Sequence, residues 1–275
     1  MSLLSHESGL NLIQPNWPDL PTNVRAFSTT RLRGVSGAPY DDGAGGGGLN
    51  LGNHVGDDIA RVSQNRSLLN ALLPSDVTFL SQIHGNIAVD ASNLNSQSSV
   101  SNAANVAIAA VEADACYTQT KDVVCAVLTA DCLPILLASL DGRFVAAVHA
   151  GWRGLAGEII ENTVQILREQ GAVELTSWLG PAIGPSAFEV GEDVYLAFSK
   201  KVLQLDRFIK TRSILTGKAQ KYDMDIYGIA RDILNQHGVQ RVHGGEYCTV
   251  SQPELFYSYR RDGCTGRMAN LIWKS

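Results

Sequence analysis

Residues 123–154 read VVCAVLTADCLPILLASLDGRFVAAVHAGWRG, and this stretch decides the fold. Two of its apolar runs, Val123–Leu128 and Phe144–Val148, have the length and composition of strands. A third apolar run, Pro134–Leu140, lies between them. The stretch therefore predicts strands in close succession at the middle of the chain.

A helix is the clearest element after this stretch. Apolar side chains recur on one helical face over 155–170, and Gly171 suits the position after its last turn. Further helices are expected near 57–73, where Asp57 and Asp58 favour an N-terminus, and over 225–237. Short strands are expected at 26–31, 77–80, 255–259 and 268–273. Because helices and strands mix without a strict alternation, the predicted fold class is α+β.

The domain is expected to span residues 26–275 as a single unit. Residues 1–25 contain three prolines and are expected to form an irregular lead-in. Residues 91–105, ASNLNSQSSVSNAAN, are polar and predict a surface loop or insertion within the domain.

The composition favours a soluble globular protein of a reducing compartment. Hydrophobic residues make up 45% of the 275 residues, so a sizeable core can be buried. The net charge of −5 argues against a nucleic-acid or anionic-membrane binder, and no apolar run approaches the roughly 18 residues of a membrane span. The N-terminus lacks the pattern of a secretory signal. We therefore expect a cytoplasmic protein without nucleic-acid or membrane partners, and its oligomeric state stays open.

The five cysteines and six histidines are the residues most suited to chemistry. An odd cysteine count without dense pairing argues against a disulfide framework, which leaves the thiols free for metal binding or catalysis. His84, Cys132 and His149 each follow a strand-like run, and a Gly or Pro follows within two residues. Three protein ligands with an open fourth position are the arrangement of a catalytic zinc site. The alternative is that such cysteines are small core residues, as expected for Cys116 and Cys125.

Several motifs resemble one known family, the YfiH-type family. Its members are variously described as multicopper polyphenol oxidases (laccase-like), peptidoglycan editing factors and purine nucleoside phosphorylases. The resemblance runs from about residue 26 to the end of the chain. The motifs are STTRLRGVS (28–36), LNLGNHVGDD (49–58), SQIHGN (81–86), TADCLP (129–134), HAGWRG (149–154), GPAIGPSAFEVG (180–191) and FYSYRRDGCTGRMA (256–269).

The resemblance implies a fold, a metal site and an activity. The fold is grouped with a toxin-type cysteine hydrolase fold, in which sheets pack together with helices outside. A Zn²⁺ site of His, Cys and His falls on His84, Cys132 and His149. The implied activity is phosphorolysis of adenosine, inosine, guanosine and methylthioadenosine, with deamination of adenosine. The implied partners are therefore a purine nucleoside and phosphate.

Two other enzymatic functions and one non-enzymatic function are alternatives. Six histidines are too few for the multinuclear copper set of a true laccase, but two His and one Cys also suit a single Cu²⁺. A polyphenol oxidase with bound copper is therefore one alternative. Another is an amide hydrolase that edits peptidoglycan precursors, with Cys132 as nucleophile and His149 as base. The third is a scaffold without catalysis.

Further residues follow from the implied reaction. Asp131 is the expected proton shuttle, with a structural hydrogen bond to turn amides as its alternative, and Glu189 is a second carboxylate. Arginine forks suit phosphate, and the candidates lie in the matching motifs. The expected substrate-binding residues are Arg31, Arg153, Glu189, Cys248 and Arg260, and Trp152 and Tyr259 are candidates for stacking on a purine.

Overall fold

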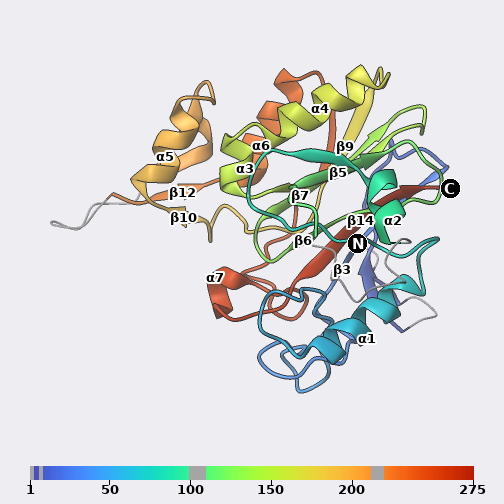
Figure 1. Ribbon diagram of the computed structural model, residues 1–275. Coiled ribbons are helices and arrows are strands. Elements are labelled where there is room, and N and C mark those ends of the chain that lie inside the picture. The colour runs from blue at the N-terminus through green and yellow to red at the C-terminus, as the bar shows by residue number, and fades with distance from the viewer. Residues whose placement is uncertain (1–2, 6–8, 99–109, 212–219) are drawn as a thin grey trace.

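Two β-sheets lie face to face in the computed structural model, which describes residues 3–5, 9–98, 110–211 and 220–275 (Figure 1). The pairs β13–β9 and β4–β5 are parallel, and the other described pairs are antiparallel. These mixed sheets confirm the expected α+β class. The first sheet has the order β1 (Leu3–Ser5), β2 (Asn11–Ile13), β3 (Val24–Thr29), β14 (Met268–Lys274) and β6 (Cys125–Thr129). The second has the order β13 (Arg241–Gly244), β9 (Leu175–Leu179), β7 (Leu133–Ser139), β8 (Val145–Ala150), β5 (Ala115–Thr118) and β4 (Ala88–Asp90). A small third sheet joins β10 (Glu189–Val190), β12 (Tyr222–Met224) and β11 (Ile209–Thr211).

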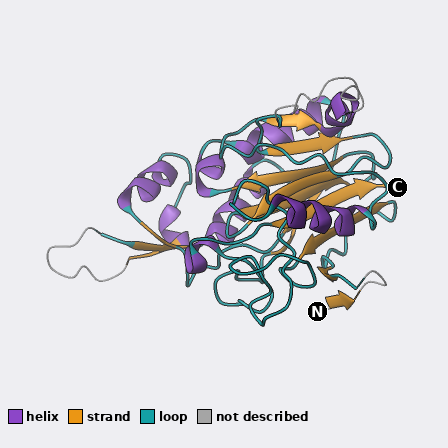
Figure 2. Ribbon diagram, turned by 60° about the horizontal axis from the view of Figure 1, so that its bottom comes forward, coloured by secondary structure: helices purple, strands orange, loops and turns teal. Residues whose placement is uncertain are grey.

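Helices cover the outer faces of the two large sheets (Figures 1 and 2). The helices α3 (Trp152–Ala156), α4 (Ile159–Glu169) and α6 (Ile226–Gln236) share one apolar core with the second sheet. The helix α1 (Ile59–Asn70) shares another with the first sheet, and a third core lies between the sheets. The other helices are α2 (Ala91–Ser98), α5 (Glu192–Ser199), α7 (Tyr259–Asp262) and the short 3₁₀ helix η2 (Leu205–Phe208).

The central stretch forms β6, β7 and β8, and every residue of these strands is buried. Side chains alternate along β7, so Leu133, Ile135 and Leu137 join the helix-side core. Leu136 and Ala138 join the core between the sheets. Because β6 belongs to the first sheet and β7 to the second, the chain changes sheets within residues 130–132.

Local capping explains where the helices begin. The Asp58 carboxylate accepts a hydrogen bond from the Ala60 amide at the start of α1, and Asp225 accepts one from Gly228 at the start of α6. The helices expected near 57–73 and over 225–237 are thus confirmed. The helix expected over 155–170 is instead divided into α3 and α4, because Glu158 has the left-handed φ of 75°.

Several segments differ from the sequence-based expectation. The 1–25 lead-in is not irregular throughout, because it contains β1 and β2, and β2 pairs with β3. Residues 91–98 of the expected polar loop form α2, and residues 99–105 lie outside the described residues. The assignment of 26–275 to one domain stays a prediction.

Two expected strands are absent from the described structure. Residues 77–80 belong to no strand ladder, and beside them Ser81 makes an isolated bridge to Glu112. Residues 255–258 form no strand either, because the Ser258 side chain caps α7 by accepting from the Arg261 amide. Apolar composition alone could not show that these segments lack a strand partner. Nor does any helix in the described ranges combine the length and apolar character required to cross a bilayer.

Candidate metal centre

Three candidate ligands meet where the chain passes between the two large sheets. The ligand atoms of His84, Cys132 and His149 all lie within 4.8 Å of one another. The Cys132 Sγ lies 3.8 Å from His84 Nε2, and the two imidazole rings meet edge to face with centroids 4.8 Å apart. Within the described residues, this is the one group of three His, Cys, Asp or Glu side chains placed to hold an ion.

The register of β7 and β8 brings two of the three ligands together. Leu133 pairs with Ala150, so the start of β7 lies beside the end of β8. Side chains two residues apart share a face of a strand. His149 therefore continues the face of Val145 and Ala147, which lies between the sheets. The apolar core between the sheets ends at His149, so the candidate metal ligands lie at the edge of this core.

Asp114 holds His149 and the loop of His84 in place. It directly precedes β5, opposite His149, and its side chain is fully buried. Its carboxylate accepts a 2.8 Å hydrogen bond from His149 Nδ1 and bonds from the amides of His84 (2.9 Å) and Gly85 (2.6 Å). These bonds hold the His84 loop, where His84 itself has a φ of 60°. They also leave His149 Nε2 as the nitrogen that can ligate a metal.

The charges of the centre are strongly coupled. Burial opposes ionisation of the Cys132 thiol, but the imidazoles of His149 and His84 outweigh it and lower its pKa to about 6. Burial likewise disfavours a charged His149, but the Cys132 thiolate and the Asp114 carboxylate raise its pKa to about 9. Without a metal, Cys132 and His149 therefore form a thiolate–imidazolium pair at neutral pH.

The donor set fits a transition metal. In a tetrahedral zinc site, with Zn–N of about 2.0–2.1 Å and Zn–S of about 2.3 Å, donor atoms lie about 3.4–3.6 Å apart. The 3.8 Å between Cys132 and His84 is close to that separation. Gly151 provides the space, since a Cβ there would lie 3.0 Å from both Cys132 Sγ and His84 Cδ2.

The three ligands open into a cavity of about 390 Å³, which we call the metal-site cavity. Tyr259 stands at its wall with 61% of its surface exposed, as an aromatic group free to stack on a flat ligand. The lining residues are His54, Leu80, Gln82, His84, Leu128, Thr129, Ala130, Cys132, His149, Tyr259 and Arg267.

Asp131 lies next to Cys132 but its carboxylate is already engaged. One oxygen accepts a 2.5 Å hydrogen bond from Thr249 Oγ1, and the other accepts a 2.6 Å bond from the Arg260 amide. Asp131 is buried and has a φ of 96°. This geometry favours the structural alternative, in which Asp131 fixes the crossing between the sheets.

The arginines expected to bind phosphate do not line the metal-site cavity. Arg31 is 7% exposed and donates to the carbonyls of Asp41 and Pro253. Arg153 is exposed, and its guanidinium lies 4.4 Å from the Trp152 ring centroid.

The other expected substrate-binding residues also lie outside the cavity wall. Arg260 donates to the carbonyl of Glu189, at the start of β10, and Cys248 Sγ accepts from the Gly184 amide. The structure therefore brings together the three ligands but not Arg31, Arg153, Glu189, Cys248 and Arg260.

Four site residues were not predicted from the sequence: Asp114, His54, Gln82 and Arg267. Asp114 stands between two alanines, and its role depends on the pairing of β5 with β8, which no local pattern reveals. Gln82 precedes His84 by two residues and bonds the main chain of Leu128 through both side-chain atoms. Arg267 lies in the last matching motif, where its sequence position offered a usable signal.

The chain is similar to curated proteins along nearly its whole length. It is 44% identical over 264 residues to the purine nucleoside phosphorylase YfiH of Escherichia coli K12, covering 95% of this chain and 98% of that protein. It is 41% identical over 268 residues to a purine nucleoside phosphorylase of Haemophilus influenzae, covering 96% and 99%.

Solved structures are also similar to this chain along nearly its whole length. A Neisseria meningitidis protein matches with a TM-score of 0.82 and 40% identity, over 96% of this chain and 99% of that one. YlmD of Geobacillus stearothermophilus matches with a TM-score of 0.82 and 27% identity, over 100% and 99%. The family model described as multi-copper polyphenol oxidoreductase laccase matches residues 25–275. This chain therefore belongs to that family, the YfiH-type family.

Proposed function

We propose that this chain is a zinc-dependent purine nucleoside phosphorylase that also deaminates adenosine. The observation that carries the proposal is the open His84, Cys132 and His149 set, held by Asp114 at the wall of a cavity. The names of the relatives supply the reaction class, since the proteins of Escherichia coli and Haemophilus influenzae are purine nucleoside phosphorylases. A cavity of about 390 Å³ falls in the range of small-molecule sites.

Each residue has a distinct part in the proposed reaction. A zinc ion held by His84, Cys132 and His149 would supply Lewis-acid polarisation and acidify water at its open position. Asp114 keeps the His149 proton on Nδ1, away from the ligating nitrogen. Tyr259 stacks on the purine base, and Asp131 positions the segment that carries Cys132.

Product analysis tests the proposal directly. Metal-replete protein is incubated with adenosine, with and without inorganic phosphate, and adenine, inosine and ribose phosphate are separated. Phosphate-dependent release of adenine, with inosine formed in both reactions, is expected. Absence of every product would exclude the proposed activity.

A Cys–His amide hydrolase is the second candidate, and the thiolate–imidazolium pair of Cys132 and His149 favours it. This chemistry would suit the cysteine hydrolase fold and the editing of peptidoglycan precursors that the sequence resemblance implies. A bound metal and a free nucleophilic thiolate exclude each other, because the metal occupies the sulfur. Inhibition by a chelator supports the zinc enzyme, whereas activation by a chelator supports the hydrolase.

Copper is the alternative metal for the same ligands. Two imidazoles and one thiolate suit Cu²⁺ as well as Zn²⁺, and the family description includes polyphenol oxidation. Elemental analysis of protein purified without added metal decides between them. We expect zinc at about one ion per chain, since the site offers one set of three protein ligands. Stoichiometric copper without zinc would favour the oxidase.

A further inference from the structure

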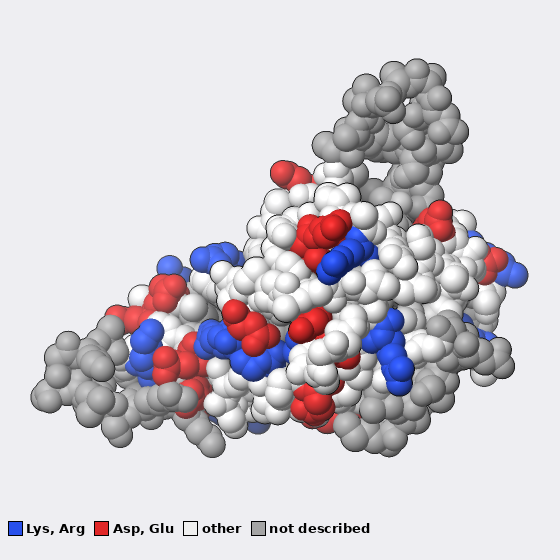
Figure 3. All heavy atoms as spheres, turned by 90° about the horizontal axis from the view of Figure 1, so that it is seen from below, with Lys and Arg blue, Asp and Glu red and all other residues white. Residues whose placement is uncertain are grey.

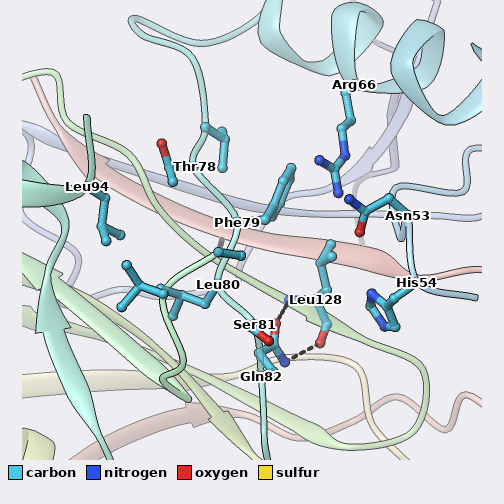
Figure 4. Close-up of a pocket in the computed structure, with 13 residues that line it drawn as sticks. Asn53, His54, Arg66, Thr78, Phe79, Leu80, Ser81, Gln82, Leu94 and Leu128 are labelled. Atoms are coloured by element: carbon cyan, nitrogen blue, oxygen red, sulfur yellow. Dashed lines mark hydrogen bonds between the residues drawn. The ribbon is translucent and has the colours of Figure 1, made fainter. Parts of the chain in front are cut away.

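A second cavity adjoins the metal-site cavity. It measures about 550 Å³ and lies under α1, where Arg66 projects toward Asn53 and Phe79 (Figure 4). Four residues line both cavities and form their common wall: His54, Leu80, Gln82 and Leu128. A ligand at the metal centre can therefore extend beside His54 toward Arg66.

The two cavities carry cationic side chains without lining carboxylates. Arg66 and Arg267 line them beside His54, whose pKa is lowered by burial and by the two arginines, and no Asp or Glu is among the described residues of either wall. On the lower face of the molecule, by contrast, many basic side chains lie beside acidic ones (Figure 3). The cavity walls thus favour an anion.

Both arginines keep donors for such an anion. Arg267 Nη1 donates to the carbonyls of Thr265 and Gly266, each at 3.0 Å, and within the described residues its Nε and Nη2 have no hydrogen-bond partner. Arg66 donates to the Leu51 carbonyl through Nε and Nη2, which leaves Nη1 without a partner in the same described part. These main-chain bonds fix both guanidinium groups in place before any ligand arrives.

No carboxylate neutralises these arginines at close range. Neither forms an ion pair in the part of the chain that the structure describes. Burial lowers the pKa of both guanidinium groups, and the charges of Cys132 and Asp131 oppose this effect most strongly at Arg267. Asp131 is already engaged by Thr249 and the Arg260 amide. A bound anion would offset the cost of burying these charges.

We propose that Arg267, with His54 and Arg66 beside it, binds the inorganic phosphate consumed in phosphorolysis. This inference rests on the proposed function. A phosphate oxygen forms a bond to C1′ of the ribose while the bond from C1′ to N9 of the purine breaks. The purine keeps the electron pair and takes the proton of the phosphate, which gives the free base and ribose 1-phosphate. Arg267 orients the attacking phosphate, since planar guanidinium forks match its geometry.

Calorimetric titration of the zinc-loaded chain with inorganic phosphate tests the site without requiring turnover. We expect Arg267→Gln to weaken phosphate binding and to raise the KM for phosphate by about tenfold or more, as for loss of a charge-assisted hydrogen bond. Arg66→Gln should give a smaller loss, and the exposed Arg143→Gln is the matched control.

The outcomes separate this inference from the proposed function. Phosphate binding that Arg267→Gln and Arg66→Gln leave unchanged, at equal zinc content, overturns the site. Binding lost in Arg267→Gln supports the site even if the wild-type chain releases no purine, in which case the proposed function alone fails. A wild-type chain that binds a nucleoside 5′-monophosphate but not inorganic phosphate overturns the assignment in favour of a phosphate ester.

Discussion

Replacement of Asp114 by Asn should weaken metal binding while the chain still folds. The fully buried carboxylate accepts from His149 Nδ1 and from the amides of Ile83, His84 and Gly85. Each of its two oxygens accepts at least one backbone amide. An Asn side chain has only one acceptor oxygen, so in either orientation its NH₂ group faces a backbone N–H.

The expected loss follows from the position of Asp114 behind a ligand. Removal of a carboxylate that orients a ligating imidazole costs about 10–100-fold in metal affinity. That factor corresponds to about 1.4–2.8 kcal/mol. If the amide faces the His149 ring, the imidazole carries its proton on Nε2, the nitrogen required for ligation. The metal-free variant should also lose roughly 1–3 kcal/mol of stability, the cost of an unsatisfied buried donor.

Competition with a chromogenic chelator measures the zinc affinity of wild-type chain and variant. Asp141→Asn is the matched control, because Asp141 also accepts a side-chain and a backbone hydrogen bond, from Ser139 and the Arg143 amide, but lies at the β7–β8 turn. The control should retain wild-type affinity. Unchanged zinc affinity in Asp114→Asn would refute the reasoning that Asp114 prepares His149 for the metal.

Three further predictions follow from the same geometry. Gly151→Ala should reduce bound zinc by about tenfold or more, because the new Cβ lies 3.0 Å from Cys132 Sγ and His84 Cδ2. Mass spectrometry measures the zinc per chain, and full occupancy would show that the ligands shift freely. At pH 7, zinc binding should release about one proton, because the pKa of His149 is raised to about 9 while that of Cys132 is lowered to about 6. Calorimetry in buffers of different ionisation enthalpy counts the protons, and the ultraviolet absorbance of the metal-free chain shows whether Cys132 is a thiolate; a count near zero or the absence of thiolate absorbance would contradict the thiolate–imidazolium pair. Tyr259→Ala should raise the KM for nucleosides at least about fivefold, from a stacking energy of roughly 1 kcal/mol or more, with Tyr259→Phe close to wild type. Steady-state kinetics decide, and equal KM values for both variants would exclude stacking.

The candidate ligands could be predicted because the signal is local. His84, Cys132 and His149 each combine a ligand side chain with a strand-like run and a following Gly or Pro. Two of them lie at strand ends in the structure, and their atoms meet within 4.8 Å. A pattern within a few residues was enough to indicate such positions.

The supporting residues could not be predicted because their roles depend on long-range pairing. Asp114 reaches His149 only through the register of β5 with β8. Arg267 faces the cavity, whereas Arg31 uses its donors on distant carbonyls, and neither outcome is encoded in the spacing of arginines. The break between α3 and α4 depends on one residue, Glu158, in a left-handed conformation that its side chain does not favour.

Strand assignments failed where apolar residues lacked a partner strand. Residues 77–80 and 255–258 have the composition of strands, yet residues 77–80 line the second cavity and residues 255–258 lead into α7, which Ser258 caps. Residues 134–140 have a similar composition, and all but the last of them belong to β7 (Leu133–Ser139), because β8 and β9 lie on either side. An apolar composition indicates that a segment is buried. The segment forms a strand only where a neighbouring strand pairs with it.

The most direct measurement follows bound zinc and nucleoside turnover in the same sample during stepwise removal of the metal by a chelator. If His84, Cys132 and His149 hold the zinc that phosphorolysis requires, release of purine base should fall in proportion to zinc and return when zinc is restored. Cys132→Ala, folded but unable to complete the ligand set, should bind little zinc and release no base. Turnover that persists or rises as zinc is removed would contradict the account.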